Sequence, residues 1–434
     1  MSWPALGRIG PRVRTRSGSQ PIEYNLLLTA TLCLLAFGVV MVFSASSTTA
    51  LLGQSGDSAY YLKRTLVVGA IGLVLMRMLS VRGARLMRPL TGAFLLVSFG
   101  LLVAVMLPGI GSSANGAQRW IGAGPFQLQP SELAKLALVL YGANLLAVRP
   151  QMTRSIRTLV PYLAVVGLGC LLMMVEPDLG TSIVVCLATA ALLVAAGVEI
   201  RHLLLLAGAI GAVVLLAILI EPYRMARLTG FLNPTSDPSG TGFQIIQAKI
   251  ALGSGGFFGV GLGQSLQKAF YLPEAHTDMI AAVIGEELGF VGIAALLSLF
   301  GLFGYAGLRT AQRARDRYTK LLATGLTSMV LIQAIVNLFA VMGLAPLTGV
   351  PLPFVSYGNS SLLVMLASTG LLLNVARGGT AAAPSRREGG AARLRVVDGG
   401  RGRSASSRAK GRDSRGGNRG TRRSGAGGRR RAAR

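Results

Sequence analysis

The sequence is poor in charged residues, in cysteine and in histidine. Only 14% of its 434 residues are charged, against about 25% in an ordinary soluble domain. Its three cysteines, Cys33, Cys170 and Cys186, all lie in apolar runs, which excludes a disulfide scaffold. The two histidines, His202 and His276, are too few for a zinc cage. These shortages exclude the small secreted domains and the zinc proteins.

Acidic residues are scarce as well. The 16 Asp and Glu residues stand against 43 Lys and Arg residues, which gives a formal charge of +27. Many of the bases lie in the tail 377–434, whose Ala, Gly, Ser and Arg composition predicts disorder. We interpret the tail as a solvated arm attracted to anionic lipid of the inner leaflet. No folded nucleic-acid recognition module accompanies it, so we expect no specific nucleic-acid partner.

Apolar residues, in contrast, make up 52% of the chain, and the mean hydropathy is +0.57. A bilayer core needs about 20 apolar residues per helix, and ten runs approach that length. The sequence therefore predicts an all-α polytopic membrane protein with its membrane domain at 25–376. The ten runs are 25–44, 65–80, 89–107, 131–148, 157–175, 180–197, 202–220, 280–305, 321–343 and 361–376.

Lys and Arg residues are concentrated in alternate loops. The loops 77–88, 149–157 and 309–320 are rich in them, as is the segment 1–24 before the first run. Because positive residues favour the cytoplasmic side, we expect both termini in the cytoplasm. The other loops then face outward, and the longest, 221–279, separates the seventh run from the eighth. So long a connection is usually functional or disordered, and its apolar stretches predict that it packs on the membrane surface or dips into it.

Chemically unusual residues gather in these outward loops. Arg119 and Trp120 precede the fourth run, at whose start Glu132 and Lys135 lie three residues apart on one helix face. A guanidinium forks onto phosphate oxygens, which makes Arg119 a candidate diphosphate ligand, although a neighbouring Trp is also typical of an interfacial anchor. Glu132 and Lys135 are either an internal ion pair that locks helix packing or a direct substrate contact.

Two carboxylates flank Pro177 between the fifth and sixth runs. Asp178 falls in the first turn of a helix, where a cap is the better interpretation. Glu176 is left to pair with a base or to help bind a metal ion. We therefore keep Glu176 and Asp178 as possible ligands of a divalent cation, Mg²⁺ or Mn²⁺.

The densest group of ionisable residues lies at the outer end of the eighth run. Lys268, Glu274, His276 and Asp278 occur there within eleven residues. Asp278 has two interpretations, a cap for the orphan amides of the following helix or a general base kept dry at the membrane edge. Composition alone favours the cap.

A segment rich in proline and glycine, 346–361, precedes the last run. Irregular backbone at membrane depth must be buried in protein or line a cavity. The hydroxyls of Ser356, Ser360 and Ser361 then either bind a sugar or phosphate, or satisfy polar groups of the segment itself.

Taken together, these motifs resemble the SEDS family of shape, elongation, division and sporulation proteins, from Tyr24 to Arg377. The run 267–271 is most similar to the division and sporulation branch. Two stretches depart from the family pattern: Met-Ile-Ala-Ala at 279–282 replaces Phe-Ile-Phe-Ala, and Gly-Asn-Ser-Ser at 358–361 replaces Gly-Gly-Ser-Ser. The resemblance rests on the segments 116–121, 130–135, 176–181, 271–278 and 351–358, which occur in the family's order and spacing.

The resemblance implies a peptidoglycan glycosyltransferase that polymerises lipid II at the outer face of the bacterial cytoplasmic membrane, at the division septum. It implies Asp278 as the catalytic general base, and a class B penicillin-binding protein and other divisome membrane proteins as partners. No nucleotide is expected, because the lipid-linked donor carries its own activation and no phosphate-cradling Gly-rich loop occurs. We expect the substrate to be bound by Arg119, Trp120, Glu132, Lys135, Lys268, Glu274, His276, Ser356, Ser360 and Ser361.

Two other functions stay open. A lipid II flippase would also use ionisable residues within the membrane, but it should place them along a path through both leaflets. In this sequence they crowd the outer edge. A non-catalytic divisome scaffold for a transpeptidase needs no carboxylate at Asp278.

Overall fold

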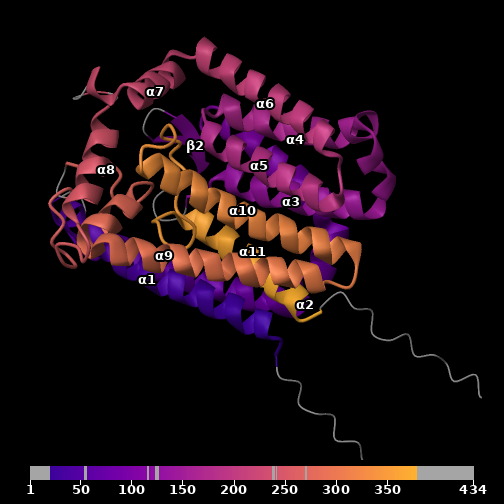
Figure 1. Ribbon diagram of the computed structural model, residues 1–434, viewed down its shortest axis with the longest axis horizontal. Helices are drawn as coiled ribbons and strands as arrows, with labels where there is room; N and C mark the ends of the chain where they lie inside the picture. Colours follow the sequence, from indigo (N-terminus) through magenta and orange to yellow (C-terminus); the bar gives the residue numbers. More distant parts are fainter. Residues whose placement is uncertain are drawn as a thin grey trace, which may run out of the picture. The chain divides into compact units, whose positions relative to one another are not determined.

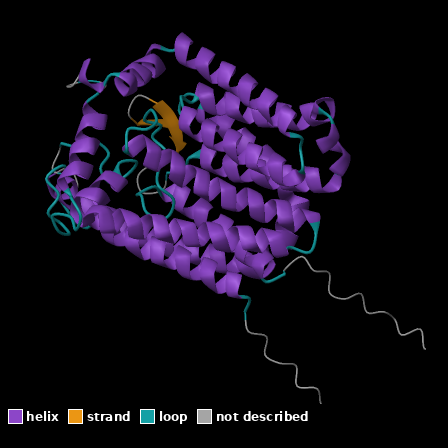
Figure 2. Cartoon of the chain, in the orientation of Figure 1, coloured by secondary structure: helices purple, strands orange, loops and turns teal. Residues whose placement is uncertain are grey.

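The protein is predominantly helical. Within the part of the chain that the computed structural model describes, there are eleven α-helices, two short 3₁₀ helices and one two-stranded hairpin (Figures 1 and 2). Nine of these helices are long and apolar enough to cross a membrane, which confirms the predicted polytopic all-α fold. Most of the segment 1–24 and of the tail 377–434, with its predicted disorder, lies outside the described residues. The structure describes residues 20–52, 56–114, 117–122, 127–236, 240, 242–268 and 271–378.

The long helices are α1 (Ile22–Leu52), α2 (Tyr60–Val105), α3 (Pro130–Val148), α4 (Ile156–Val175), α5 (Leu179–Ala196), α6 (Ile200–Ile220), α9 (Ile280–Arg313), α10 (Arg317–Val341) and α11 (Asn359–Ala376). The predicted loop between the seventh and eighth runs contains two shorter helices. These are α7 (Pro222–Leu232) and α8 (Phe243–Ser254). The remaining elements are β1 (Gly111–Ala114), β2 (Ala117–Ile121), η1 (Pro150–Arg154) and η2 (Pro234–Ser236).

The connections fall on two faces of the helix bundle. The Asp278 face holds the β1–β2 hairpin, the α4–α5 turn, α7, and the segment before α11. The arginine face holds the start of α1 and the ends of α3, α9 and α11, where Arg317 donates to the carbonyls of Leu146 and Ala196 and Arg313 pairs with Glu23. This grouping agrees with the alternation predicted from Lys and Arg residues. Which face meets the cytoplasm stays a prediction.

The second and third predicted runs lie in one helix, α2, of 46 residues. A straight helix of that length would measure about 69 Å, more than twice a bilayer core of ~30 Å. Its contacts show instead that it turns back. Tyr61 packs on His276 at the Asp278 face, Ser80 and Ala84 bond to Asn374 near the arginine face, and the last turns adjoin the β1–β2 hairpin. The chain thus crosses the bundle twice within α2.

Local sequence sets several helix ends. α3 begins at Pro130, whose fixed φ suits the first helical position. Asp178 and Asp316 are the N-caps of α5 and α10, and each carboxylate accepts a hydrogen bond from the backbone N–H three residues later. α5 ends at Gly197 in the left-handed conformation, with φ of 88°. The cap predicted for Asp178 is confirmed.

α9 is interrupted at Gly289, whose φ is 64°. The loop 255–261 pairs with the backbone groups that the interruption frees: its N–H groups donate to the carbonyls of Glu286 and Glu287, and its carbonyls accept from the two residues after Gly289. A Cβ at Gly259 would lie 2.1 Å from the carbonyl oxygen of Glu287, so the approach requires glycine. This part of the long loop therefore packs on α9, and its predicted packing on the membrane surface stays a prediction.

The helices differ widely in how far they are enclosed. In α11, 83% of the residues are buried, and α11 packs mainly on α2, with further contacts to α1, α3, α9 and α10 (Figure 1). α6 buries only Ala217. Because the side chains of α6 after Arg201 and His202 are apolar on all sides, it presents a surface suited to lipid.

Candidate active site

Asp278 lies immediately before α9, in a loop that α10 holds in place. The side-chain amide of Asn337 donates to the main-chain carbonyl of Asp278 at 2.7 Å and to that of Val350 at 2.8 Å. α9 begins at Ile280 and has Met279 as its N-cap. Asp278 therefore does not cap α9, and the interpretation of this residue as a helix cap is wrong.

The carboxyl group of Asp278 is partly buried and sparsely hydrogen-bonded. The hydroxyl of Thr277 approaches its Oδ1 at 3.4 Å, and Gly349 lies beside its Oδ2. Burial, followed by repulsion from the carboxylate of Glu274, raises the pKa of Asp278 to about 7, against the opposing attraction of Arg227. A carboxyl group with this pKa is suited to accept a proton near neutral pH.

α7 brings two arginines to this face. Arg227 donates to the carbonyl of Leu347 at 3.0 Å, and Arg224 donates to the carbonyl of Met174 at 2.7 Å. α7 thus ties the end of α4 to the segment before α11, and it places Arg227 where its charge acts on Asp278. Sequence reasoning missed both arginines. The available signal was an outward segment that starts with a proline and carries two arginines three residues apart.

Glu274 and His276 precede Asp278 in the same loop. The ring of His276 lies against those of Tyr61 and Tyr357, with centroid distances of 4.4 and 5.6 Å. Burial lowers the pKa of His276 against the effect of Glu274, so its ring is neutral at neutral pH. Glu274 is exposed and accepts a hydrogen bond from the Thr277 hydroxyl at 2.8 Å. The structure brings these three predicted residues together.

The segment 346–361 is partly buried, and its residues 352–356 are fully enclosed by the protein, as predicted for irregular backbone. A Cβ at Gly38 of α1 would lie 2.5 Å from the carbonyl oxygen of Phe354, and one at Gly180 of α5 would lie 2.6 Å from that of Thr348. The backbone of the segment therefore approaches α1 and α5 closely at positions where these helices carry glycine. This close approach places residue 349 beside the carboxyl group of Asp278.

The three predicted serines are buried and hydrogen-bonded inside the protein. Ser356 accepts from a backbone N–H four residues earlier at 2.8 Å, Ser360 accepts from the N–H of Gln129 at 2.9 Å, and Ser361 accepts from the side chain of Gln333 at 3.2 Å. Ser356 thus satisfies the segment itself, as one interpretation predicts, whereas Ser360 and Ser361 bond to the residue before α3 and to α10. Their binding of a sugar or phosphate stays a prediction.

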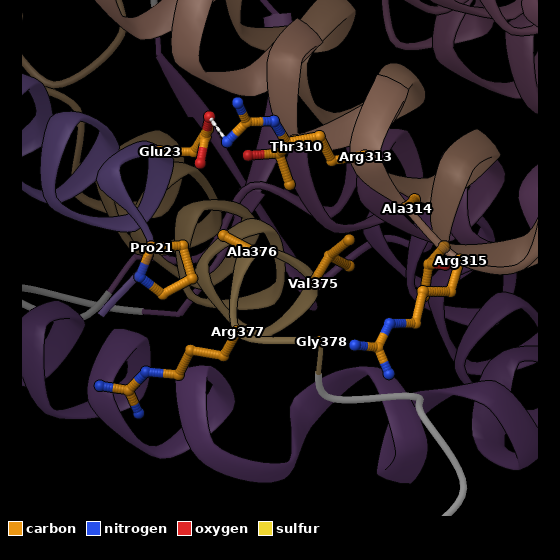
Figure 3. Close-up of a pocket in the computed structure, with 11 residues that line it drawn as sticks. Pro21, Glu23, Thr310, Arg313, Ala314, Arg315, Val375, Ala376, Arg377 and Gly378 are labelled. Carbon is orange, nitrogen blue, oxygen red and sulfur yellow. Dashed lines mark ion pairs between the residues drawn. The ribbon is translucent and has the colours of Figure 1, made fainter. Parts of the chain in front are cut away.

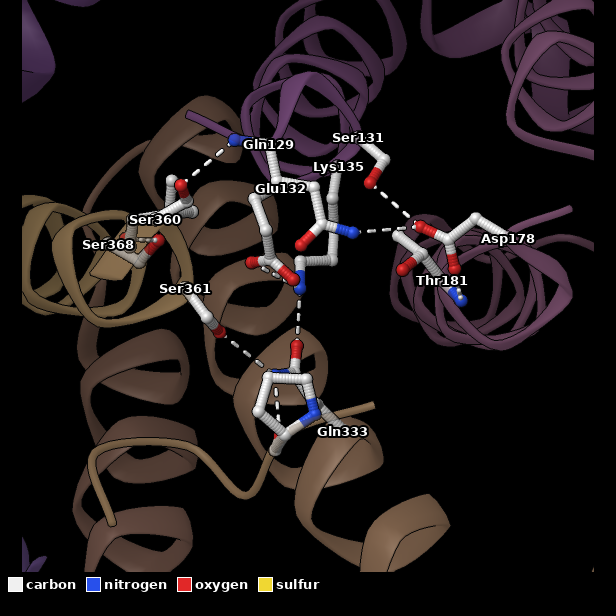
Figure 4. A network of polar contacts seen from close by, with 12 residues as sticks. Gln129, Ser131, Glu132, Lys135, Asp178, Thr181, Gln333, Ser360, Ser361 and Ser368 are labelled. Atoms are coloured by element: carbon white, nitrogen blue, oxygen red, sulfur yellow. Dashed lines mark hydrogen bonds and ion pairs between the residues drawn. The ribbon is translucent and has the colours of Figure 1, made fainter. Parts of the chain in front are cut away.

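Glu132 and Lys135 form an internal ion pair on α3. Their charged atoms are 2.8 Å apart, and each side chain is only 1% exposed. The ammonium of Lys135 also donates to Gln333 on α10, whose amide donates to the carbonyl of Pro351 at 2.9 Å (Figure 4). The pair therefore joins α3, α10 and the buried segment, as expected of an ion pair that fixes helix packing.

Lys268 belongs to a different buried cluster. Its ammonium is 2.8 Å from the carboxylate of Glu287 on α9, and the hydroxyl of Ser44 on α1 donates to that same carboxylate. Ser265 donates to the neighbouring Glu286. These contacts fasten the loop 255–268 to two helices, and no contact joins Lys268 to Asp278 in the described part of the chain.

Arg119 fastens the β1–β2 hairpin to the α4–α5 turn. Its Nε donates to the carbonyl of Glu176 at 2.8 Å and its Nη2 to that of Pro177, while the adjacent Trp120 pairs with β1. Both carboxyl oxygens of Glu176 are buried without a hydrogen-bond partner among the described residues. Burial, followed by the nearby Asp178, raises the pKa of Glu176 to about 8, although Arg119 opposes this. Glu176 is thus protonated more readily than an ordinary Glu.

Glu176 and Asp178 do not form a metal site as they stand. Oδ1 of Asp178 accepts from the N–H of Thr181, and its Oδ2 accepts from Ser131 at 2.8 Å and Gln129 at 3.2 Å (Figure 4). Across the described ranges, no three His, Cys, Asp or Glu side chains are grouped so as to hold an ion. This donor set does not fit a resident cation, and the Mg²⁺ or Mn²⁺ ion stays a prediction.

Two side-chain amides on α10 hold the loops of the site in place by hydrogen bonds, and they were not singled out from the sequence. Gln333 and Asn337 lie one helical turn apart, so they share a face. Together they bond to the carbonyls of Pro351, Val350 and Asp278. Two carboxamides four residues apart within an apolar run were the signal that could have revealed them.

The chain matches known proteins over almost the whole described region. The model of the FtsW/RodA/SpoVE family, described as cell cycle proteins, matches residues 24–380. Stage V sporulation protein E of Bacillus subtilis (strain 168) is 43% identical over 354 residues, which cover 81% of this chain and 96% of that protein. A probable peptidoglycan glycosyltransferase FtsW of Trichlorobacter lovleyi is 42% identical over 362 residues, which cover 82% and 94% of the two chains.

Solved structures show the same likeness. A chain from a peptidoglycan synthase complex that coordinates polymerization and crosslinking is 33% identical, with a TM-score of 0.67 and coverage of 82% of this chain and 98% of that one. The rod shape determining protein RodA of Thermus thermophilus is 30% identical, with a TM-score of 0.60 and coverage of 81% and 95%. The resemblance to the SEDS proteins is therefore confirmed, and this chain belongs to the FtsW/RodA/SpoVE family of cell cycle proteins.

Proposed function

We propose that this chain is a peptidoglycan glycosyltransferase that polymerises lipid II, with Asp278 as its general base. A relative named as a probable peptidoglycan glycosyltransferase, 42% identical over 82% of the chain, supports the activity. The observation that carries the assignment of Asp278 is its carboxyl group, which is not used to cap α9 and has a pKa raised to about 7.

The proposed reaction joins two sugars. The 4-hydroxyl of the acceptor attacks the anomeric carbon of the donor, and Asp278 accepts the hydroxyl proton as the new carbon–oxygen bond forms. The bond from the anomeric carbon to the diphosphate oxygen breaks, and undecaprenyl diphosphate leaves with the electron pair. Asp278 then releases its proton to water, which its pKa of about 7 permits at neutral pH.

Arginines on the Asp278 face are suited to neutralise the leaving diphosphate. The charge of Arg227 acts on Asp278, and Arg119 lies at the α4–α5 turn. A guanidinium binds phosphate oxygens with two parallel hydrogen bonds. Lys135 and Lys268 are buried in ion pairs. We therefore assign these two lysines to helix packing rather than to the diphosphate.

We further propose that the enzyme works at the outer face of the cytoplasmic membrane, at the division septum, with a class B penicillin-binding protein and other divisome proteins. The relative of solved structure that belongs to a peptidoglycan synthase complex supports such a partnership. The outward orientation rests on the alternation of Lys and Arg residues between loops.

The test is polymerisation of labelled lipid II by the purified full-length protein, with and without the transpeptidase partner. Asp278→Asn keeps the size of the side chain and removes the proton acceptor, so polymer formation should fall by ~10²–10⁴-fold while lipid II binding is retained. Asp316→Asn is the matched control. It makes the same change at the N-cap of α10, where Asn caps about as well as Asp, and it should leave polymerisation unchanged.

Three results would contradict the proposal. Near wild-type polymerisation by well-folded Asp278→Asn would show that Asp278 is not the general base. Transfer of lipid II across vesicle bilayers by wild-type protein that makes no polymer would establish the flippase alternative. Recruitment of the transpeptidase without either activity would establish the scaffold.

A further inference from the structure

A cavity lies on the arginine face, at the ends of the helices opposite to Asp278. Its volume is about 240 Å³, and it is bounded by the start of α1, the turn between α9 and α10, and the end of α11 (Figure 3). Pockets that hold drug-sized ligands usually measure ~300–1,000 Å³. The cavity is therefore sized for a small group such as a phosphate ester.

The charged side chains around the cavity are mostly basic. Arg313, Arg315 and Arg377 line it together with one acid, Glu23, which pairs with Arg313 (Figure 3). Arg377 lies over the ring of Tyr24 at 4.3 Å and donates to its hydroxyl at 2.8 Å, but its Nε is buried and has no acceptor among the described residues. The guanidinium charges of Arg315 and Arg377 are thus not neutralised by a carboxylate of the lining.

We propose that this cavity binds the phosphodiester head group of an anionic phospholipid. Guanidinium groups match the oxygens of a phosphate, and the guanidinium groups of Arg315, which is exposed, and of Arg377 line the cavity. The cavity lies where the apolar helices α1, α9 and α11 end, and helices that span a bilayer end near the head groups of its lipids. Basic pockets between transmembrane helices are known to bind such head groups.

The rest of the lining favours a lipid over a soluble phosphate, which shares the same recognition chemistry. Pro21, Ala314, Val375 and Ala376 add apolar surface beside the arginines. Apolar surface suits the glycerol and the first acyl carbons of a lipid, and it offers nothing to inorganic phosphate. A lipid bound here would connect α1, α9 and α11 at one point.

The test uses the purified full-length protein in detergent and does not depend on enzymatic activity. Phosphatidylglycerol, phosphatidylcholine and inorganic phosphate are each titrated, and binding is followed by the shift in Tm and by native mass spectrometry. Phosphatidylglycerol should raise Tm and stay bound, since a ligand of the folded state stabilises it. Arg315→Gln should weaken this binding by about tenfold or more, the loss expected for one hydrogen bond to a charged group.

Arg157→Gln is the matched control, because Arg157 is exposed at the start of α4 on the same face and does not line the cavity. It should bind phosphatidylglycerol like the wild type. If Arg157→Gln weakens binding equally, the lipid is attracted to the basic surface in general and not bound in this cavity. If phosphatidylcholine binds equally well, the cavity does not select an anionic head group. If inorganic phosphate stabilises the protein as much as phosphatidylglycerol does, the ligand is a soluble phosphate and not a lipid.

Discussion

The acidity of a single side chain, Asp278, sets the pH at which the proposed reaction can run. Its pKa is raised from an ordinary 3.8 to about 7 by burial and by Glu274, and only the unprotonated carboxylate can accept the proton of the acceptor hydroxyl. The rate of polymerisation should therefore fall as the pH drops below about 7 and level off above it. Initial rates with labelled lipid II on both sides of pH 7 provide the measurement. A rate that stays constant down to pH 5, well below this pKa, would show that Asp278 is not the base.

The parts of the site that are neighbours on the chain could be predicted from the sequence. Glu274, His276 and Asp278 lie within five residues, so their clustering follows from the chain itself. Arg227 and Asn337 reach the same place from other elements, and only the packing of α7 and α10 shows that they do. The sequence could not exclude the cap role of Asp278 either, because that depends on α9 starting two residues later.

At the scale of helices, α3 and α10 are joined by the buried pair of Glu132 and Lys135. Lys135→Met should leave the carboxylate of Glu132 buried without its cation and lower the free energy of unfolding by about 3–5 kcal/mol. The double variant Glu132→Gln/Lys135→Met removes both charges and should recover most of this loss. Denaturant unfolding in detergent measures both. If Lys135 instead served the substrate, Lys135→Met would keep its stability and bind lipid II weakly.

The helices themselves were largely predictable, because long apolar runs need no tertiary information. All ten runs appear in the structure, two of them within α2. The β1–β2 hairpin was not predicted, since strands of four and five residues with Gly, Ser and Ala leave little periodicity. The kink of α9 could not be predicted from the sequence either. The left-handed φ of Gly289 is needed only because the loop 255–261 pairs with the helix there.

For the whole molecule, the orientation in the membrane remains to be measured. In a variant without Cys33, Cys170 and Cys186, single cysteines can be placed at Gln264 and at Arg157, which are exposed residues near opposite faces of the bundle. An impermeant maleimide should label the cysteine at 264 in intact cells and the cysteine at 157 only after permeabilisation, because positive residues favour the cytoplasm. The reverse pattern would invert the topology and exclude an outer-face reaction.

The central position of α11 among the other helices also has a consequence for biosynthesis. A membrane protein is made from its N-terminus, and its domains begin to form while synthesis continues. α11 leaves the ribosome after all the other described helices, yet it is the one that fills the space among α1, α2, α3, α9 and α10. The most enclosed helix is therefore the last one to be made. Until α11 is made, the earlier helices lack the hydrogen bonds that it supplies, such as those between Ser360 and the main-chain N–H of Gln129 and between Asn374 and the backbone of α2.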